Sequence, residues 1–258
     1  MLTKPEILHI TKQQLALDFG CDAADFERPE ITIVEPRLLE GRRVYESDGS
    51  FFRMLVFGSK AVISAAPEIL PWCAEHLGKR DPAWLFEHPK LRMIDNKLRE
   101  FGHEIADMHQ FYLPKPGGAG ARAGQPPAFA VCWYEQDQLQ QFKDDERFGE
   151  AFAFDENRPD VLAVAALDGE KIMGMAGASA DSATMWQIGI DTVPEYRGRG
   201  VGTALTALIT EEILRRGKVP FYGTAVSHFH SQNIAINAGF FPAWVELYTR
   251  RVDSKEIP

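Results

Sequence analysis

The stretch PEYRGRGVGTAL, residues 194–205, decides how the rest of the sequence is interpreted. Its glycines at 198, 200 and 202 are interspersed with Arg197 and Arg199, and a helical apolar pattern begins directly afterwards. The first turn of a helix has backbone N–H groups without partners inside the helix, and the helix dipole places partial positive charge there. Glycines remove the Cβ atoms that would hold a phosphate away. The stretch therefore predicts a site for a phosphate-bearing ligand, with arginines adding bidentate contacts.

Two common phosphate-binding motifs do not fit this stretch. The dinucleotide motif G-x-G-x-x-G fails, because neither Gly198 nor Gly200 is followed at the required spacing by the last glycine. A Walker loop is excluded as well, because no G-K-[ST] tripeptide closes the stretch. The pattern that does fit is R-x-x-G-x-G, formed by Arg197, Gly200 and Gly202.

The segments around this loop alternate between strand and helix patterns. A hairpin of two strands is predicted in VLAVAALDGEKIMGMAGAS, with Asp168-Gly169 at its turn. The strand MWQIGIDTV precedes the loop, and a helix at 201–216 follows it. Then come the strand VPFYGTAV, a short helix in SQNIAINAGF capped by Ser231, and the strand AWVELYTRRV. With the strand FAVCWYE and an amphipathic helix in QDQLQQFKDDERFGEAF, these elements predict an α+β fold with a mixed sheet.

The R-x-x-G-x-G loop, followed by a helix, a strand and a second short helix ending in NAGFFPAW, resembles the acetyl-CoA site of the GNAT N-acetyltransferases. The resemblance covers roughly residues 128–258 and implies a GNAT-like mixed central sheet flanked by helices. In that family the cofactor lies in a V-shaped gap between two splayed parallel strands. The cofactor-binding residues that the resemblance implies are Ile190, Thr192, Val193, Arg197, Gly198, Arg199, Gly200, Val201, Gly202, Thr203, His228 and Ser231.

The resemblance also implies direct transfer of acetyl from the thioester to an amine, assisted by a base and an acid. An amine with a pKa of about 10.4 is neutral in about one molecule per thousand near pH 7, a deficit of about 4 kcal/mol that a base or an apolar pocket must offset. The family's acid is often a tyrosine four residues before the Gly-Phe of the last helix, and here that position is Ala235. A thiol with a pKa of about 8.5 leaves tolerably without an acid, so the base matters more.

Candidates for the base and the acid lie near the loop and on the last strand. Asp191 ends the strand before the loop, and His228 and His230 lie in SHFHS, where a histidine suits base catalysis near neutral pH. Glu246 and Tyr248 on the last strand are further candidates, with Tyr248 as an acid if it points inward. A purely structural role stays open for each. The catalytic residues that we expect are Asp191, His228 and Tyr248.

Composition limits the classes of partner and the compartment. The formal charge of the 258 residues is −9, so we expect no nucleic-acid partner, because phosphate contacts need a basic face. No apolar run approaches the roughly 20 residues of a membrane span, and MLTKPEILHI lacks the apolar core of a secretory signal, so no membrane partner is expected. The scattered Cys21, Cys73 and Cys132 argue against a disulfide framework and predict a cytoplasmic location.

A metal site is not expected. The segment HEIADMH, 103–109, departs from H-E-x-x-H, because Asp107 stands where the second histidine would be and His109 lies six residues after His103. Two histidines at that spacing do not share a helical face. The cofactor expected is therefore acetyl-CoA alone, as a co-substrate.

The chain is expected to divide into residues 1–113, a linker rich in proline and glycine at 114–127, and residues 128–258. The N-terminal part contains strand patterns in ITIVEP and FFRMLVFG and helix patterns in APEILPWCAEHLG and HPKLRMIDNKLREFG, and so predicts a smaller α+β domain. Three roles for it stay open: a lid over the acceptor, a divergent second copy of the fold, or a module for binding or homodimerisation.

Two functions of different classes follow from the sequence. The first is an N-acetyltransferase that moves acetyl from acetyl-CoA to a primary amine on a small molecule or a peptide. The alternative is a catalytically silent CoA-binding sensor or interaction protein. Ala235 and the lack of a glutamate base on the 185–193 strand support this alternative. Release of CoA on addition of amines separates the two.

Overall fold

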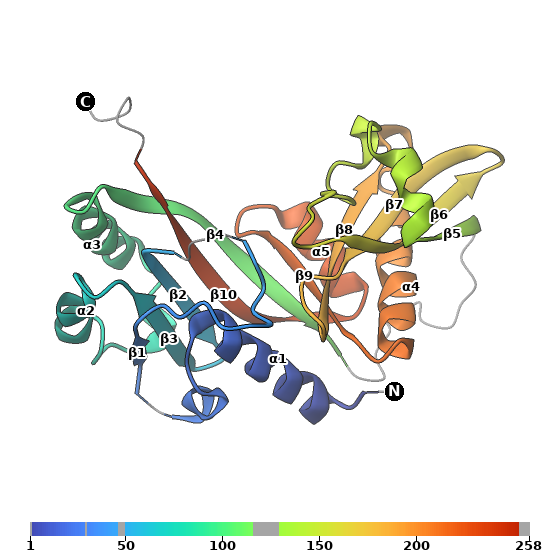
Figure 1. The fold of residues 1–258 in the computed structure, drawn as a ribbon. Helices are drawn as coiled ribbons and strands as arrows, with labels where there is room; N and C mark the ends of the chain where they lie inside the picture. The colour runs from blue at the N-terminus through green and yellow to red at the C-terminus, as the bar shows by residue number, and fades with distance from the viewer. Residues whose placement is uncertain (1, 29, 46–49, 116–128, 253–258) are drawn as a thin grey trace. The chain divides into compact units, whose positions relative to one another are not determined.

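The computed structural model describes residues 2–28, 30–45, 50–115 and 129–252 (Figure 1). The chain forms two compact units, and each is made of two stretches of sequence. The first unit contains Met1–Thr11 and Phe111–Pro242, and the second contains Lys12–Gln110 and Ala243–Pro258. Residues 116–127 of the expected linker lie outside the described residues. In the described part of the chain, no helix combines the length and the apolar character needed to cross a membrane.

The first unit is built around a mixed sheet. Its strands are β5 (Ala130–Glu135), β6 (Asp160–Asp168), β7 (Lys171–Ser179), β8 (Met185–Thr192) and β9 (Val219–Ala225), and β9 also neighbours β4 (His103–Pro114). From β5 to β8 each strand pairs antiparallel with the next, whereas β8 and β9 are parallel. The expected mixed α+β fold is therefore confirmed, and so is the turn at Gly169, whose φ of +62° suits glycine.

Alternation along β6 builds two cores on the two faces of this sheet. Leu162, Val164 and Ala166 pack with the inward residues of α4 (Val201–Arg215) and α5 (Phe229–Asn237). Ala163 and Ala165 point to the other face, where they meet aromatic side chains of the segment 136–154. The strand period of two thus places helices on one face and a loop-rich segment on the other.

Two local expectations for the first unit need correction. The amphipathic helix expected in residues 136–152 is wrong: the segment forms two short 3-10 helices, η3 (Gln136–Phe142) and η4 (Glu146–Phe148). The Asp145 side chain accepts a hydrogen bond from the N–H of Arg147 and starts a new turn there, which interrupts any continuous helix. Ser231 is not the cap of α5, because the helix begins at Phe229 with His228 as its N-cap residue.

The second unit has a sheet in the order β1-β3-β2-β10-β4. Its strands are β1 (Thr32–Val34), β2 (Phe52–Phe57), β3 (Lys60–Ala65), the part of β10 (Phe240–Arg251) from Ala243 onward, and the part of β4 up to Gln110. The helices α2 (Leu70–His76) and α3 (His88–Arg99) cover one face, where they pack on apolar residues of β2 and β3. The helix α1 (Lys4–Phe19), which the sequence analysis did not predict, supplies Asp18 and Phe19 to the other face. Short 3-10 turns at η1 (Ala23–Glu27) and η2 (Pro82–Trp84) complete the unit.

Candidate active site

The two parallel strands of the first unit lose their pairing halfway along. The register of β8 and β9 runs from Met185 opposite Val219 to Ile188 opposite Tyr222. Among the described residues, the continuations 189–192 and 223–225 do not pair with each other, whereas 189–192 remain paired with β7. The backbone of β8 that faces β9 is therefore open beyond Ile188, and a ligand that carries amides can pair with it.

The glycine-arginine loop follows the open end of β8 and leads into α4. Gly198 and Gly200 have φ values of +76° and +79°, a left-handed conformation that a side chain would strain. Gly200 is the N-cap residue of α4, and no side chain of the described residues caps this end. The first N–H groups of α4 therefore have no partner within the helix and face whatever lies before its N-terminus.

Gly202 is required for close packing behind this N-terminus. A Cβ on Gly202 would lie 3.1 Å from Ile234 Cδ1 and 3.2 Å from Thr192 Oγ1, and 3.6 Å from Ile190 Cγ1. A Cβ on Gly198 would meet nothing within 4 Å, so that side of the loop is open. The loop is thus packed on one side and accessible on the other, which fits a phosphate-bearing ligand bound to backbone N–H groups.

Both arginines of the loop are exposed and partly anchored. Arg197 Nε donates to the carbonyl of Thr192 at 3.1 Å, which ties the loop to the end of β8. The guanidinium of Arg199 lies 5.3 Å from the ring centre of Tyr196, whose hydroxyl donates to Asp168 at 3.0 Å. Among the described residues the Nη groups of Arg197 and Arg199 have no hydrogen-bond partner, so both remain able to contact an anion.

Asp191 fastens the segment after η4 to the sheet. Its Oδ2 accepts hydrogen bonds from the backbone N–H of Glu150 at 2.8 Å and of Ala151 at 2.9 Å. Two glycines make room for this segment: a Cβ on Gly189 would lie 2.0 Å from the Glu150 carbonyl oxygen, and one on Gly177 would lie 2.1 Å from that of Ala151. Burial raises the pKa of the half-buried Asp191 carboxyl, and the backbone hydrogen bonds oppose this only in part.

Tyr222 stands at the last paired position of β9, where the two strands part. Its side chain is buried in the core under α4 and α5, and its hydroxyl lies 2.8 Å from Ser231 Oγ in the first turn of α5. Burial raises the pKa of Tyr222 to about 12. Ala235, the position at which the family often has its tyrosine, is fully buried in the same core. A tyrosine hydroxyl is thus present near the N-terminus of α5, but the tyrosine belongs to β9 and not to the helix.

The remaining expected catalytic residues lie in two different places. His228 and His230 are exposed, at the N-cap and in the first turn of α5. Tyr248 belongs to the second unit, where its hydroxyl donates to Glu246, and burial followed by the charge of Glu246 raises its pKa far above the ordinary value. The expected cofactor-binding residues 190, 192, 193, 197–203, 228 and 231 all lie in the first unit.

Sequence analysis missed Tyr222 and the contact of Asp191 with residues 150 and 151. A usable signal was present for the latter, because glycine inside a strand often marks a close approach of backbone, and β7 and β8 contain Gly177 and Gly189. The signal for Tyr222 was weaker, since nothing in VPFYGTAV indicates where pairing with β8 ends. In the described residues, no group of three histidine, cysteine or carboxylate side chains could hold a metal ion, and HEIADMH forms part of β4.

Comparison with known proteins gives one family match and a set of distant structural likenesses. Residues 128–240 match the profile of the acetyltransferase (GNAT) family. No curated protein matches the chain. A GNAT-family structure from Novosphingobium aromaticivorans DSM 12444 is 16% identical, with a TM-score of 0.39 over 57% of this chain and 66% of that one. The chain thus spans slightly less than two thirds of that relative's length.

Two other solved structures are similar to the chain at comparably low sequence identity. A GCN5-related N-acetyltransferase-like protein from Streptococcus suis 89/1591 is 16% identical, with a TM-score of 0.46 over 80% of this chain and 87% of that one. A protein from Salmonella typhimurium, solved with its cofactor acetyl-CoA, is 13% identical, with a TM-score of 0.36 over 51% of this chain and 98% of that one. At such identities the likeness concerns the fold and assigns no substrate.

Proposed function

We propose that the chain transfers acetyl from acetyl-CoA to a primary amine, and the match of residues 128–240 to the acetyltransferase (GNAT) family profile supports this proposal. One observation carries the proposal: β8 and β9 part after Ile188 and Tyr222, and β8 then leads through the glycine-arginine loop into the uncapped N-terminus of α4. The open strand edge suits the amides of the pantetheine arm, and the helix N-terminus suits the pyrophosphate.

The residues that would hold acetyl-CoA fit the group chemically. Backbone N–H groups at the start of α4 would bind the pyrophosphate, with Arg197 and Arg199 closing around it from the open side of Gly198. The carbonyl of Thr192 already holds Arg197 in place, so that arginine would lose less side-chain freedom on binding. When bound, the cofactor supplies an activated acetyl thioester.

We propose Asp191 and Tyr222 as the base and the acid. Among the described residues Asp191 Oδ1 has no hydrogen-bond partner, while Oδ2 is held by two backbone N–H groups, so one oxygen stays able to accept a proton from the amine. The raised pKa of this carboxyl brings it closer to neutrality and makes it a stronger base than an ordinary aspartate. The buried hydroxyl of Tyr222 would donate a proton to the leaving thiolate, the role that Ala235 cannot fill.

A second function is favoured by one observation. Asp191 is engaged by the backbone of Glu150 and Ala151, so its carboxylate also has a purely structural use. If that is its only role, the domain would bind acetyl-CoA and not turn it over, as a sensor or interaction protein does. Binding and turnover must therefore be measured separately.

The first experiment is a calorimetric titration of the purified protein with acetyl-CoA, with ATP and 3′-dephospho-CoA as comparators. The proposal expects micromolar binding of acetyl-CoA and much weaker binding of ATP. Release of CoA is then followed across a panel of primary amines of small molecules and of peptides. Binding with turnover supports the transferase, binding without turnover on any amine supports the silent alternative, and no binding would exclude both.

A further inference from the structure

The second unit contains a small cavity. It lies on the face of the sheet that contacts Asp18 of α1, opposite the face covered by α2 and α3. Its volume is about 30 Å³, which is room for a few non-hydrogen atoms. Every lining residue belongs to the second unit. The lining consists of Asp18, Pro36, Arg37, Leu38, Arg42, Arg43, Tyr45, Ser50, Arg53, Ser64 and Tyr248.

The lining is dominated by positive charge. Among the described residues it contains four arginines and a single carboxylate, that of Asp18. With Glu246, which contacts two of these arginines, the described part of the group still carries more arginines than carboxylates. The other polar groups of the lining are hydroxyls of two tyrosines and two serines. Guanidinium and hydroxyl groups around a small cavity are the donors that bind an oxyanion.

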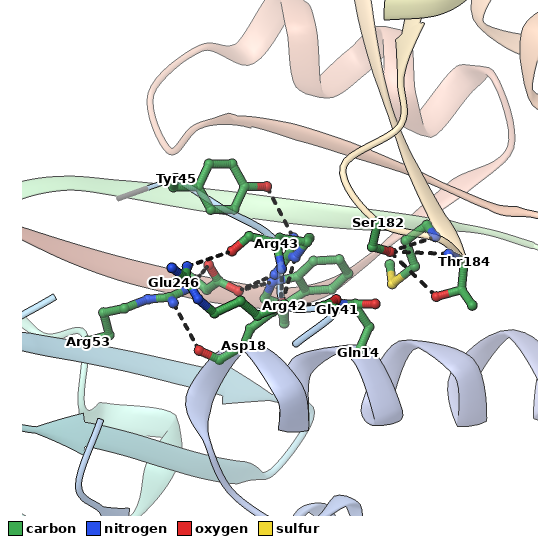
Figure 2. Close-up of polar contacts among 12 residues, drawn as sticks. Gln14, Asp18, Gly41, Arg42, Arg43, Tyr45, Arg53, Ser182, Thr184 and Glu246 are labelled. Carbon is green, nitrogen blue, oxygen red and sulfur yellow. Dashed lines mark hydrogen bonds and ion pairs between the residues drawn. The ribbon is translucent and has the colours of Figure 1, made fainter. Parts of the chain in front are cut away.

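Arg43 forms the fixed base of this arrangement. Its side chain is fully buried, and its Nε donates to Asp18 Oδ2 at 2.6 Å while Nη2 donates to Glu246 Oε1 at 3.1 Å (Figure 2). Nη1 donates to the hydroxyl of Tyr45 at 3.3 Å. Arg43 is therefore compensated by two carboxylates, and the donors that lack a hydrogen-bond partner belong to Arg53.

Arg53 is held in position but incompletely bonded. Its guanidinium carbon lies 4.5 Å from the ring centre of Phe19 and 5.3 Å from that of Tyr248. Its Nη1 donates to the Asp18 carbonyl at 3.1 Å (Figure 2). Nε and Nη2 are buried and lack a hydrogen-bond partner among the described residues. Nη2 is 3.5 Å from Glu246 Oε2, an ion pair without hydrogen-bond geometry.

The unsatisfied edge of Arg53 is the one that matches an oxyanion. Nε and Nη2 of a guanidinium form a planar fork that binds both oxygens of a carboxylate or two oxygens of a phosphate. Buried donors without partners cost free energy, and natural proteins rarely retain them without a use. Because Arg53 itself lines the cavity, a small rotation of its guanidinium would present this fork to a group bound there.

From this geometry we propose that the second unit binds a small oxyanion, the carboxylate or phosphate group of a metabolite, in the cavity beside Arg53. Arg53 would provide the bidentate fork, Arg42 and Arg37 would add charge at the rim, and the hydroxyls of Tyr45 and Ser64 would complete the donor set. The site lies wholly in the second unit and does not depend on acetyl-CoA binding in the first.

Thermal unfolding of the full chain tests the proposal with defined anions. The midpoint is measured in sodium phosphate, sodium acetate and sodium chloride at equal ionic strength. At ten times its dissociation constant, a specific anion should raise the midpoint by about 3 °C above chloride. Phosphate raising it more than acetate identifies a phosphate group as the ligand, and the reverse identifies a carboxylate. The same midpoint in all three salts overturns the proposal.

Three variants assign the effect to the cavity. Arg53→Gln and Arg42→Gln should abolish the rise specific to phosphate or acetate, and the second keeps the test decisive if the first does not fold. Arg92→Gln, which removes an exposed arginine of α3 in the same unit, should retain the rise. Calorimetric binding of acetyl-CoA should remain unchanged in all three. An equal rise in the two cavity variants and in Arg92→Gln would contradict the assignment.

Discussion

The hydroxyl of Tyr222 lies 2.8 Å from Ser231 Oγ, at the point where β8 and β9 part. The contact joins the last paired residue of a strand to the first turn of α5, and both groups are able to donate a proton. It places a polar pair at the edge of a core made mostly of aliphatic and aromatic side chains.

Replacing Tyr222 with phenylalanine should lower kcat about 10²-fold while the affinity for acetyl-CoA changes little, because the ring remains and only the proton donor is lost. The fall should be smaller with acetyl thioesters of more acidic thiols, whose thiolates leave without help. Steady-state release of the thiol measures both effects. Tyr112→Phe is the control, since Tyr112 is a buried tyrosine of the same core. Equal losses in the two variants would show that Tyr222 acts only in packing.

Replacing Gly202 with valine should weaken acetyl-CoA binding about 10²-fold, because the new side chain must displace Ile234 or Thr192 and would shift the N-terminus of α4. Calorimetric titration measures the change. Ala207→Val adds the same side chain at a half-buried position of the same helix and should bind acetyl-CoA like the unmodified protein. If Gly202→Val binds as tightly as this control, the loop is not the phosphate site.

Replacing Asp191 with asparagine should remove one ionisation from the pH dependence of both kcat/KM and the free energy of unfolding. Burial raises the pKa of this carboxyl above its ordinary 3.8, so its contribution to folding is fully present below pH 3.8 and is lost as pH rises through the higher folded value. Over the same range kcat/KM should rise with pH as the base ionises. The amide oxygen of asparagine still accepts from the N–H groups of Glu150 and Ala151, so the segment should stay in place.

Two pH series check this prediction. Urea unfolding of Asp191→Asn should depend less on pH in the acid range than that of the unmodified protein. The acid limb of the kcat/KM profile should disappear. An unchanged profile together with full activity would leave Asp191 with a structural role alone.

Replacing Glu246 with glutamine should destabilise the second unit by about 3 kcal/mol, because Arg43 and Arg53 would keep buried charges with one carboxylate fewer. Burial alone would raise the pKa of Glu246, but the two arginines outweigh it and hold the pKa below 4.5. The measurement is urea unfolding near neutral pH. Glu100→Gln, at an exposed glutamate paired with Lys97, should cost less than about 1 kcal/mol. Equal costs would mean that the buried cluster contributes no more than a surface pair.

The secondary structure near the glycine-arginine loop could be predicted because its signals are local. The helix after Gly200, the turn at Gly169 and the strands on both sides depend on neighbouring residues only. The segment 136–152 was mispredicted as one helix because its aromatic residues pack on the sheet from two short turns. The α1 helix lacks a clear apolar stripe, since its residues contribute to two units.

By itself, the sequence determined that a glycine-rich, positively charged turn leads from a strand into a helix, because bare backbone, positive charge and helix start are adjacent in the chain. Only the tertiary structure decided which side chains far apart in the chain contact one another within each unit. Tyr222 and Ser231 are nine residues apart, Asp191 and Glu150 forty-one, and Arg43 and Glu246 two hundred and three. Such partners are selected by strand register and by the burial of charge, and neither is encoded within a short window of sequence.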